Sequence, residues 1–122
     1  MTVTFCGHSH LSDVAELNVW LDKVLDLLIV DGADRFYLGG YGDFDRMAAE
    51  AVRAKKNERP DIEMALVTAY LSRQADGESY DYMIYPTLKD VTQRSAIPKR
   101  NEWMVDSADV VVAYVTHEWG GA

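Results

Sequence analysis

A run of six apolar residues near the end of the chain, 110–115, constrains the fold more than any other stretch. Four of the six are valine, and a strand that is apolar on both faces is typical of the middle of a parallel sheet covered by helices. A short helix with Pro98 in its first turn is predicted before the run, and Gly120 and Gly121 follow it. In open α/β sheets, ligands bind beyond the carboxyl ends of such strands. We therefore expect a functional site there, where a backbone without Cβ atoms can approach a phosphate.

The rest of the chain repeats the order strand, turn, helix. Short β-type runs end at glycines, and leucines and valines then recur at three- and four-residue spacing. Gly32 is the expected left-handed cap of the first helix. This rhythm predicts an α/β fold, a Rossmann-like three-layer sandwich with a mostly parallel sheet of four or five strands. The predicted strands cover 3–6, 35–38, 62–70 and 110–115, and the predicted helices begin at 12 or 13, at 43 and near 98.

The segment 71–94 is the least regular part of the chain, with a glycine and a proline inside it. It is interpreted as a loop, an extra strand at 82–85, or a flap over the site. Its three clustered tyrosines could stack on a base, although partly buried packing is the more common role of such residues. The pattern leaves these alternatives open.

Length and charge limit what the chain can be. Residues 1–122 suffice for one domain with a real core but not for two. A doubly wound sheet normally continues with another helix and strand, so we expect either four main strands or a missing last helix–strand unit.

A net charge of −8 argues against duplex nucleic acid or an anionic membrane as a partner. A small anionic ligand is compatible with this charge, because a local pocket of N–H groups and arginine can override the net charge of the chain.

The single cysteine, Cys6, excludes an internal disulfide, and no Cys/His spacing resembles a zinc site. No metal or cofactor is therefore predicted, and Cys6 is interpreted as an inert thiol inside a strand. No stretch approaches eighteen apolar residues, and the start of the chain lacks the pattern of a secretory signal. These features predict a cytoplasmic protein without a membrane span.

The first candidate site is the turn that contains Gly39, Gly40 and Gly42, directly before a helix. The glycines would let the backbone wrap a phosphate, and the helix N-terminus would supply N–H donors and its dipole. The alternative is a simple tight turn, since the spacing matches neither a dinucleotide fingerprint nor a P-loop. Asp43 and Asp45 fit a phosphate poorly. They could hold a ribose hydroxyl, bind a metal or cap the helix, and capping is favoured.

Further candidates come from the other strand ends and from one helix. Gly7 ends the first strand and, with the glycine turns at 39–42 and 120–121, would converge on one edge of a parallel sheet. Arg100 and Asn101 suit a phosphate or carboxylate, or form a solvated basic turn. His8 and Ser9 are interpreted as pocket-lining residues rather than as a nucleophilic pair, because no nucleophile elbow is present. His10, His117 and Glu118 are interpreted in the same way.

Taken together, these residues resemble a known family. The motifs that carry the resemblance are Phe-Cys-Gly-His-Ser at 5–9, Phe-Tyr-Leu-Gly-Gly-Tyr-Gly-Asp-Phe-Asp at 36–45, Arg-Asn-Glu-Trp-Met at 100–104, Ser-Ala-Asp-Val-Val-Val-Ala-Tyr-Val at 107–115 and Gly-Gly-Ala at 120–122. In this order they look like the SLOG superfamily, the Rossmann-like group that includes LOG, DprA and YpsA-like proteins. The likeness is greatest to small YpsA-related members and covers nearly the whole chain.

The resemblance implies a single SLOG-like nucleotide-binding domain. The implied ligand-binding residues are Gly7, His8, Ser9, Gly39, Gly40, Gly42, Asp45, Arg100, Asn101, Gly120 and Gly121. LOG-type members cleave the N-glycosidic bond of nucleoside monophosphates, using a threonine and a glutamate that follow the last glycine loop. This sequence stops at Ala122 and has Ser9 where many YpsA-related members have arginine. No catalytic residue is therefore assigned.

The sequence thus predicts a non-catalytic binder of a nucleotide or nucleotide-derived ligand, acting as a sensor or sequestering protein. The alternative is a LOG-like phosphoribohydrolase in which Arg100 steadies the phosphate or the departing base and Asp45 or Glu118 stabilises the ribosyl cation. A third hypothesis is a structural subunit whose glycines only make turns. Because LOG-type relatives dimerise, the resemblance also implies a homodimer or a higher homo-oligomer.

Overall fold

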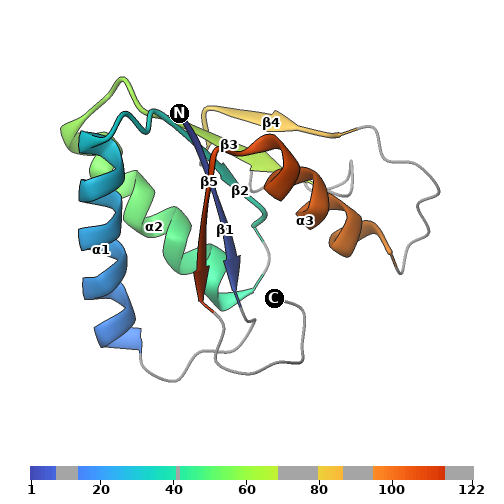
Figure 1. The fold of residues 1–122 in the computed structure, drawn as a ribbon, viewed down its shortest axis with the longest axis horizontal. Coiled ribbons are helices and arrows are strands. Elements are labelled where there is room, and N and C mark those ends of the chain that lie inside the picture. The colour runs from blue at the N-terminus through green and yellow to red at the C-terminus, as the bar shows by residue number, and fades with distance from the viewer. Residues whose placement is uncertain (8–13, 41, 69–79, 87–94, 115–122) are drawn as a thin grey trace.

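The computed structural model describes residues 1–7, 14–40, 42–68, 80–86 and 95–114 of the chain. Figure 1 shows α1 and α2 together on one side of the sheet and α3 on the other, which makes three layers. The prediction of a Rossmann-like α/β sandwich is confirmed. In chain order the elements are β1 (Thr2–Gly7), α1 (Val14–Val30), β2 (Arg35–Leu38), α2 (Asp43–Glu58), β3 (Glu63–Val67), β4 (Tyr82–Ile84), α3 (Ala96–Ser107) and β5 (Val110–Tyr114).

The sheet has five strands in the order β4-β3-β2-β1-β5, and every neighbouring pair is parallel. From β1 the chain moves outward through β2 and β3 to β4, and α3 then carries it back to β5 on the other side of β1. The direction of winding therefore reverses between β1 and β5. In open α/β sheets this reversal creates the crevice where ligands bind.

The position of β5 corrects one prediction. The apolar pattern predicts a central strand, but in the described part of the chain β5 pairs only with β1 and lies at the edge of the sheet. Val111 is 38% exposed and Ala113 is also exposed. Helix α3 packs mainly against β1, so it leaves this face of β5 open. An apolar run indicates that the side chains of a strand avoid water, but it does not indicate how many strands flank it. The pattern alone could therefore not distinguish a central strand from an edge strand.

The two faces of the sheet differ in polarity. The face covered by α1 and α2 is apolar, whereas the α3 side carries Thr4, which is fully buried and donates its hydroxyl hydrogen to the Tyr37 carbonyl at 3.0 Å. The Tyr37 ring in turn stacks on Trp103 of α3, with ring centroids 5.8 Å apart. The buried side chains on the apolar side include Val3, Phe5, Leu21, Leu25, Phe36 and Phe44.

The helix ends test the capping predictions. Gly32 has a φ of 110°, and N–H bonds from Gly32 to Ile29 and from Ala33 to Leu28 close α1, so the predicted glycine cap is confirmed as a Schellman motif. The predicted cap by Asp43 is wrong. Gly42 occupies the N-cap position without any side-chain hydrogen bond, and Asp43 is already helical.

The strand predictions hold with changed bounds, and β1 extends one residue beyond the predicted range 3–6 at each end. β2 spans the predicted residues, β3 is shorter than the predicted 62–70, and β4 supports the extra strand among the alternatives for 71–94. The predicted helix start at 12 or 13, Val115 and most of the irregular segment lie outside the described residues. Within the described ranges, no helix is long and apolar enough to cross a membrane.

Candidate functional site

The carboxyl ends of β1, β2 and β3 lie side by side, because these strands are parallel neighbours. They bring together Gly7 at the end of β1, Gly39 and Gly40 after β2, and Val67 at the end of β3. Helix α2 begins three residues after Gly40, so its N-terminus reaches the same edge. The predicted convergence of the first two glycine sites is therefore confirmed.

Arg100 of α3 anchors this edge. Its side chain is only 3% exposed, and one guanidinium nitrogen, Nη1, donates hydrogen bonds to the Gly39 carbonyl at 2.6 Å and the Val67 carbonyl at 3.1 Å. The Nε–H group donates to the side-chain oxygen of Asn101 at 3.0 Å. A buried cation requires such partners. Arg100 thus ties the ends of β2 and β3 to α3 and places a full positive charge beneath the glycine turn.

Gly39 is required by close packing. A Cβ atom there would lie 2.8 Å from the guanidinium carbon of Arg100 and 2.8 Å from carboxylate oxygen Oδ2 of Asp45. Both charged groups therefore approach the same point on the backbone, one from α3 and one from α2. The absence of a side chain at Gly39 leaves the space beside the turn that both charged groups approach.

Gly40 and Gly42 have a different reason to be glycine. Their φ angles are 68° and 92°, which side chains rarely adopt. A Cβ atom at Gly40 would also come within 2.7 Å of a Leu66 methyl carbon. The turn between β2 and α2 thus depends on these two backbone conformations and on the space at Gly39.

The first turn of α2 is acidic. Asp43 and Asp45 lie at the positive end of the helix dipole, which stabilises carboxylates. Asp43 has the exposed Arg46 as an ion-pair partner at 3.6 Å, whereas Asp45 lies over Gly39. Two carboxylates at this end make it better suited to hydroxyl or N–H donors than to a bare phosphate.

Phe44 fills the end of β1. A Cβ atom at Gly7 would collide with the Phe44 ring, so glycine is required there for space. Phe44 is 1% exposed and stacks on Tyr114 at the end of β5, with centroids 6.1 Å apart and an interplanar angle of 23°. The sequence reasoning missed both aromatic residues. An aromatic residue between the two aspartates was the available signal, but its contact with Gly7 depends on the strand order.

Cys6 is held in its neutral form. Burial raises the pKa of its thiol, and the negative charge of Asp45 raises that pKa further. The thiolate is the reactive form of cysteine, so this environment opposes nucleophilic chemistry. The geometry agrees with the predicted inert role and places Asp45 within electrostatic reach of β1.

Four predicted site residues, His8, Ser9, Gly120 and Gly121, lie outside the described residues, as do His10, His117 and Glu118. Two of the clustered tyrosines lie away from this edge, because Tyr82 begins β4 and Tyr80 precedes it, whereas Tyr85 directly follows the carboxyl end of β4. Tyr82 donates its hydroxyl hydrogen to Glu63 at 3.3 Å, and the Tyr80 ring lies 5.9 Å from the Arg53 guanidinium carbon. Among residues that the structure describes, no group of three His, Cys, Asp or Glu side chains could hold a metal ion.

Comparison with known proteins gives no family for the chain. No family model matches it, and no curated protein matches its sequence. The functional argument therefore depends on the geometry of the carboxyl edge, and the likeness to the SLOG superfamily stays a prediction.

Proposed function

We propose that the carboxyl edge of the sheet binds a nucleotide or nucleotide-derived ligand, and that the protein is a non-catalytic sensor or sequestering protein for it. One observation carries the proposal. The guanidinium of Arg100 and the carboxylate of Asp45 approach the same point beside Gly39, at the strand ends where open α/β sheets bind ligands. Three glycines lose conformational entropy on folding and a buried arginine loses its hydration, so this turn costs more free energy than a simple connection between β2 and α2 would.

The chemistry of the pair suits a ligand with both acidic and hydroxyl groups. The Asp45 carboxylate accepts hydrogen bonds from sugar hydroxyls, and the buried positive charge of Arg100 attracts an anionic group. The positive φ angles of Gly40 and Gly42 fix the course of the backbone beside this pair. Asn101, which holds the Nε side of Arg100, is a positioning residue in this scheme.

A thermal-shift screen of the purified chain against nucleoside monophosphates, ADP-ribose derivatives and cyclic nucleotides tests the proposal. Ligand at 100 times its Kd adds about 2.7 kcal/mol to the free energy of unfolding. Asp45→Asn, which keeps the size and removes the charge, should reduce the shift. The matched control is Asp61→Asn, an exposed aspartate two residues before β3 and therefore at the opposite edge of the sheet. No shift with any of these ligands, or an equal shift in both variants, would contradict the proposal.

The alternative activity is a LOG-like phosphoribohydrolase. It is favoured by one feature, the carboxylate of Asp45 inside the site, which could stabilise a ribosyl cation. Chromatography of each mixture after the screen distinguishes the two functions. Recovery of intact ligand supports a binder, whereas release of free base that Asp45→Asn abolishes supports the hydrolase.

Three further assignments belong to the same proposal. We infer membership of the SLOG superfamily, a cytoplasmic location and a homodimer or higher homo-oligomer. Light scattering during size-exclusion chromatography tests the last of these, and a monomer at micromolar concentration would contradict it.

A further inference from the structure

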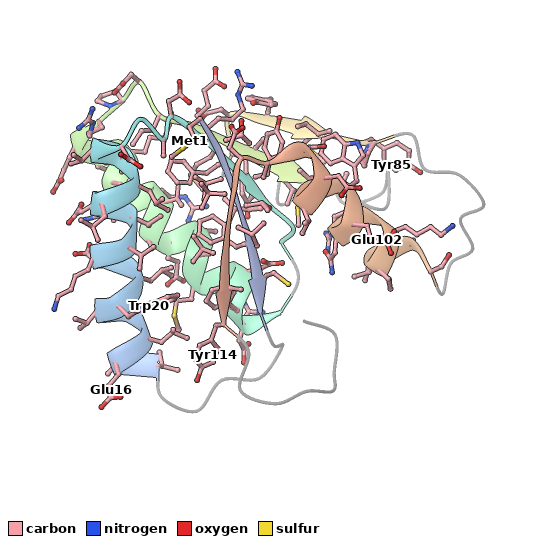
Figure 2. The ribbon with its side chains drawn as sticks, viewed as in Figure 1. Met1, Glu16, Trp20, Tyr85, Glu102 and Tyr114 are labelled. Carbon is pink, nitrogen blue, oxygen red and sulfur yellow. The ribbon has the colours of Figure 1, made fainter. Side chains whose placement is uncertain are left out.

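A hollow lies at the carboxyl edge, on the α1 side of the sheet. It is lined by Glu16, Leu17 and Trp20 of α1 and by Tyr114 at the end of β5, and it is open to solvent with a volume of about 330 Å³. Figure 2 shows Trp20 and Tyr114 near each other, with Glu16 one turn further toward the start of α1. The volume falls at the lower end of the range of roughly 300–1,000 Å³ that small-molecule sites occupy.

The location of this hollow is that of a ligand site. Tyr114 ends β5, and α1 is the first helix after β1, so the hollow lies beside the two strands between which the winding reverses. Crevices at such a reversal are where open α/β sheets bind ligands. The Gly39 cluster lies on the other side of β1, at the ends of β2 and β3.

The lining has a specific chemistry. Trp20 leaves 39% of its surface exposed although it is a large aromatic residue, and Leu17 forms a buried apolar floor. Tyr114 is held in place because its ring stacks nearly parallel on the buried Phe44. Two aromatic side chains and a leucine favour a planar ring, and the Glu16 carboxylate adds an acceptor for N–H donors.

We propose that this hollow is a subsite for a planar nitrogen heterocycle that carries an amino group, as an adenine-type nucleobase does. This inference rests on the proposed function, since the ring is the base of the ligand whose sugar hydroxyls lie toward Asp45 and Gly39. The ends of β2 and β5 are two strand spacings apart, roughly 10 Å, which one nucleotide can span. Phe44 connects the two places because it supports Tyr114 and precedes Asp45 in the first turn of α2.

Indole N–H signals in nitrogen-15 NMR spectra of the full chain provide the test. The chain has three tryptophans, and Trp20→Phe and Trp103→Phe assign their signals. Trp103 is the internal control, because it stacks on Tyr37 on the opposite face of the sheet. The probes are adenosine monophosphate, free adenine, hypoxanthine (which lacks the amino group) and ribose 5-phosphate.

We expect adenosine monophosphate and adenine to shift the Trp20 signal, and ribose 5-phosphate to leave it unchanged. Trp20→Ala should lower the affinity for adenosine monophosphate about tenfold through lost stacking, and it should leave the affinity for ribose 5-phosphate unchanged. Glu16→Gln should lower the affinity for adenine, and this loss should be roughly threefold larger than the loss of affinity for hypoxanthine. Leu27→Ala, which removes a 71% exposed apolar side chain elsewhere on α1, is the matched control and should change nothing.

The outcomes separate this inference from the proposed function. Tight binding of adenosine monophosphate with an unchanged Trp20 signal, and equal affinity in Trp20→Ala, overturns the subsite and leaves the proposed function standing. A Trp20 shift with adenine but no binding of adenosine monophosphate or ribose 5-phosphate supports the subsite and contradicts the proposed function. No response of Trp20 to any probe overturns the subsite.

Discussion

The two sides of β1 at its carboxyl end are built by different means. Toward β2 and β3, the backbone is fixed by hydrogen bonds from Arg100 and by glycines that leave room for charged groups. Toward β5, Tyr114 and Trp20 border an apolar hollow, and ring stacking on Phe44 fixes Tyr114. The first side suits polar groups and the second a flat ring. One edge of a small sheet thus offers two chemistries, and the first turn of α2 contributes to both.

Replacing Phe44 by Ala should disturb both sides and have the largest effect. The side chain is 1% exposed and fills the space beside Gly7, so its removal should lower the free energy of unfolding by about 4 kcal/mol. Urea denaturation measures this loss. Phe44→Leu is the control that keeps most of the volume, and an equally large loss in that variant would show that ring stacking rather than volume decides.

Replacing Arg100 by Met should affect only the β2–β3 side. It removes the donor to the Gly39 and Val67 carbonyls and leaves them buried, which should cost about 3 kcal/mol. Arg100→Lys should recover part of the loss, since one ammonium group can still reach a carbonyl. If the Trp20 indole signal moved as much as in Phe44→Ala, the two sides would not be independent.

Replacing Gly39 by Ala should be milder, at about 2 kcal/mol, because Arg100 and Asp45 must shift to admit the new methyl group. Gly32→Ala serves as the control. The new methyl group at position 32 would have no atom within 4 Å, so the positive φ alone should lower the free energy of unfolding by about 1 kcal/mol. Equal losses measured by denaturation, with ligand affinity unchanged in both, would indicate that the charged groups are not packed firmly against the turn.

The smallest effect concerns the Cys6 thiol. Burial and the Asp45 charge raise its pKa above the ordinary value of 9.0, so the rate of alkylation by iodoacetamide, which follows the thiolate fraction, should still be rising with pH at that value instead of levelling off. The folded chain then binds more protons than the unfolded one above pH 9.0, and the free energy of unfolding should fall as the pH rises through the folded pKa. Asp45→Asn should move the alkylation profile to lower pH, and an unchanged profile would place Asp45 too far from Cys6 to act.

Local sequence was informative wherever the cause of a structure is local. The cap at Gly32 and the bounds of β2 follow from backbone preference and side-chain alternation within a few residues. The convergence of Gly7 and Gly39 also followed, because parallel strands place equivalent ends together.

Features that depend on strand order could not be predicted. The edge position of β5, the contact between Phe44 and Gly7 and the hollow at Trp20 each join residues far apart in the chain. The N-cap at Gly42 rather than Asp43 shows the same limit at short range. The glycine conformation required by the turn begins the helix one residue earlier than the capping preference of aspartate suggests.

The bond from Arg100 to Gly39 also bears on how the chain reaches its folded state. It joins residues 61 positions apart, so it forms only after β2, β3 and α3 have come together. Closing so long a loop costs conformational entropy, so we expect this contact to be absent from the folding transition state. Arg100→Lys should then hasten unfolding and leave the folding rate unchanged, which stopped-flow mixing can measure. The glycine turn would become competent for binding only in the last step of folding, so newly made chains would not compete for ligand before that step.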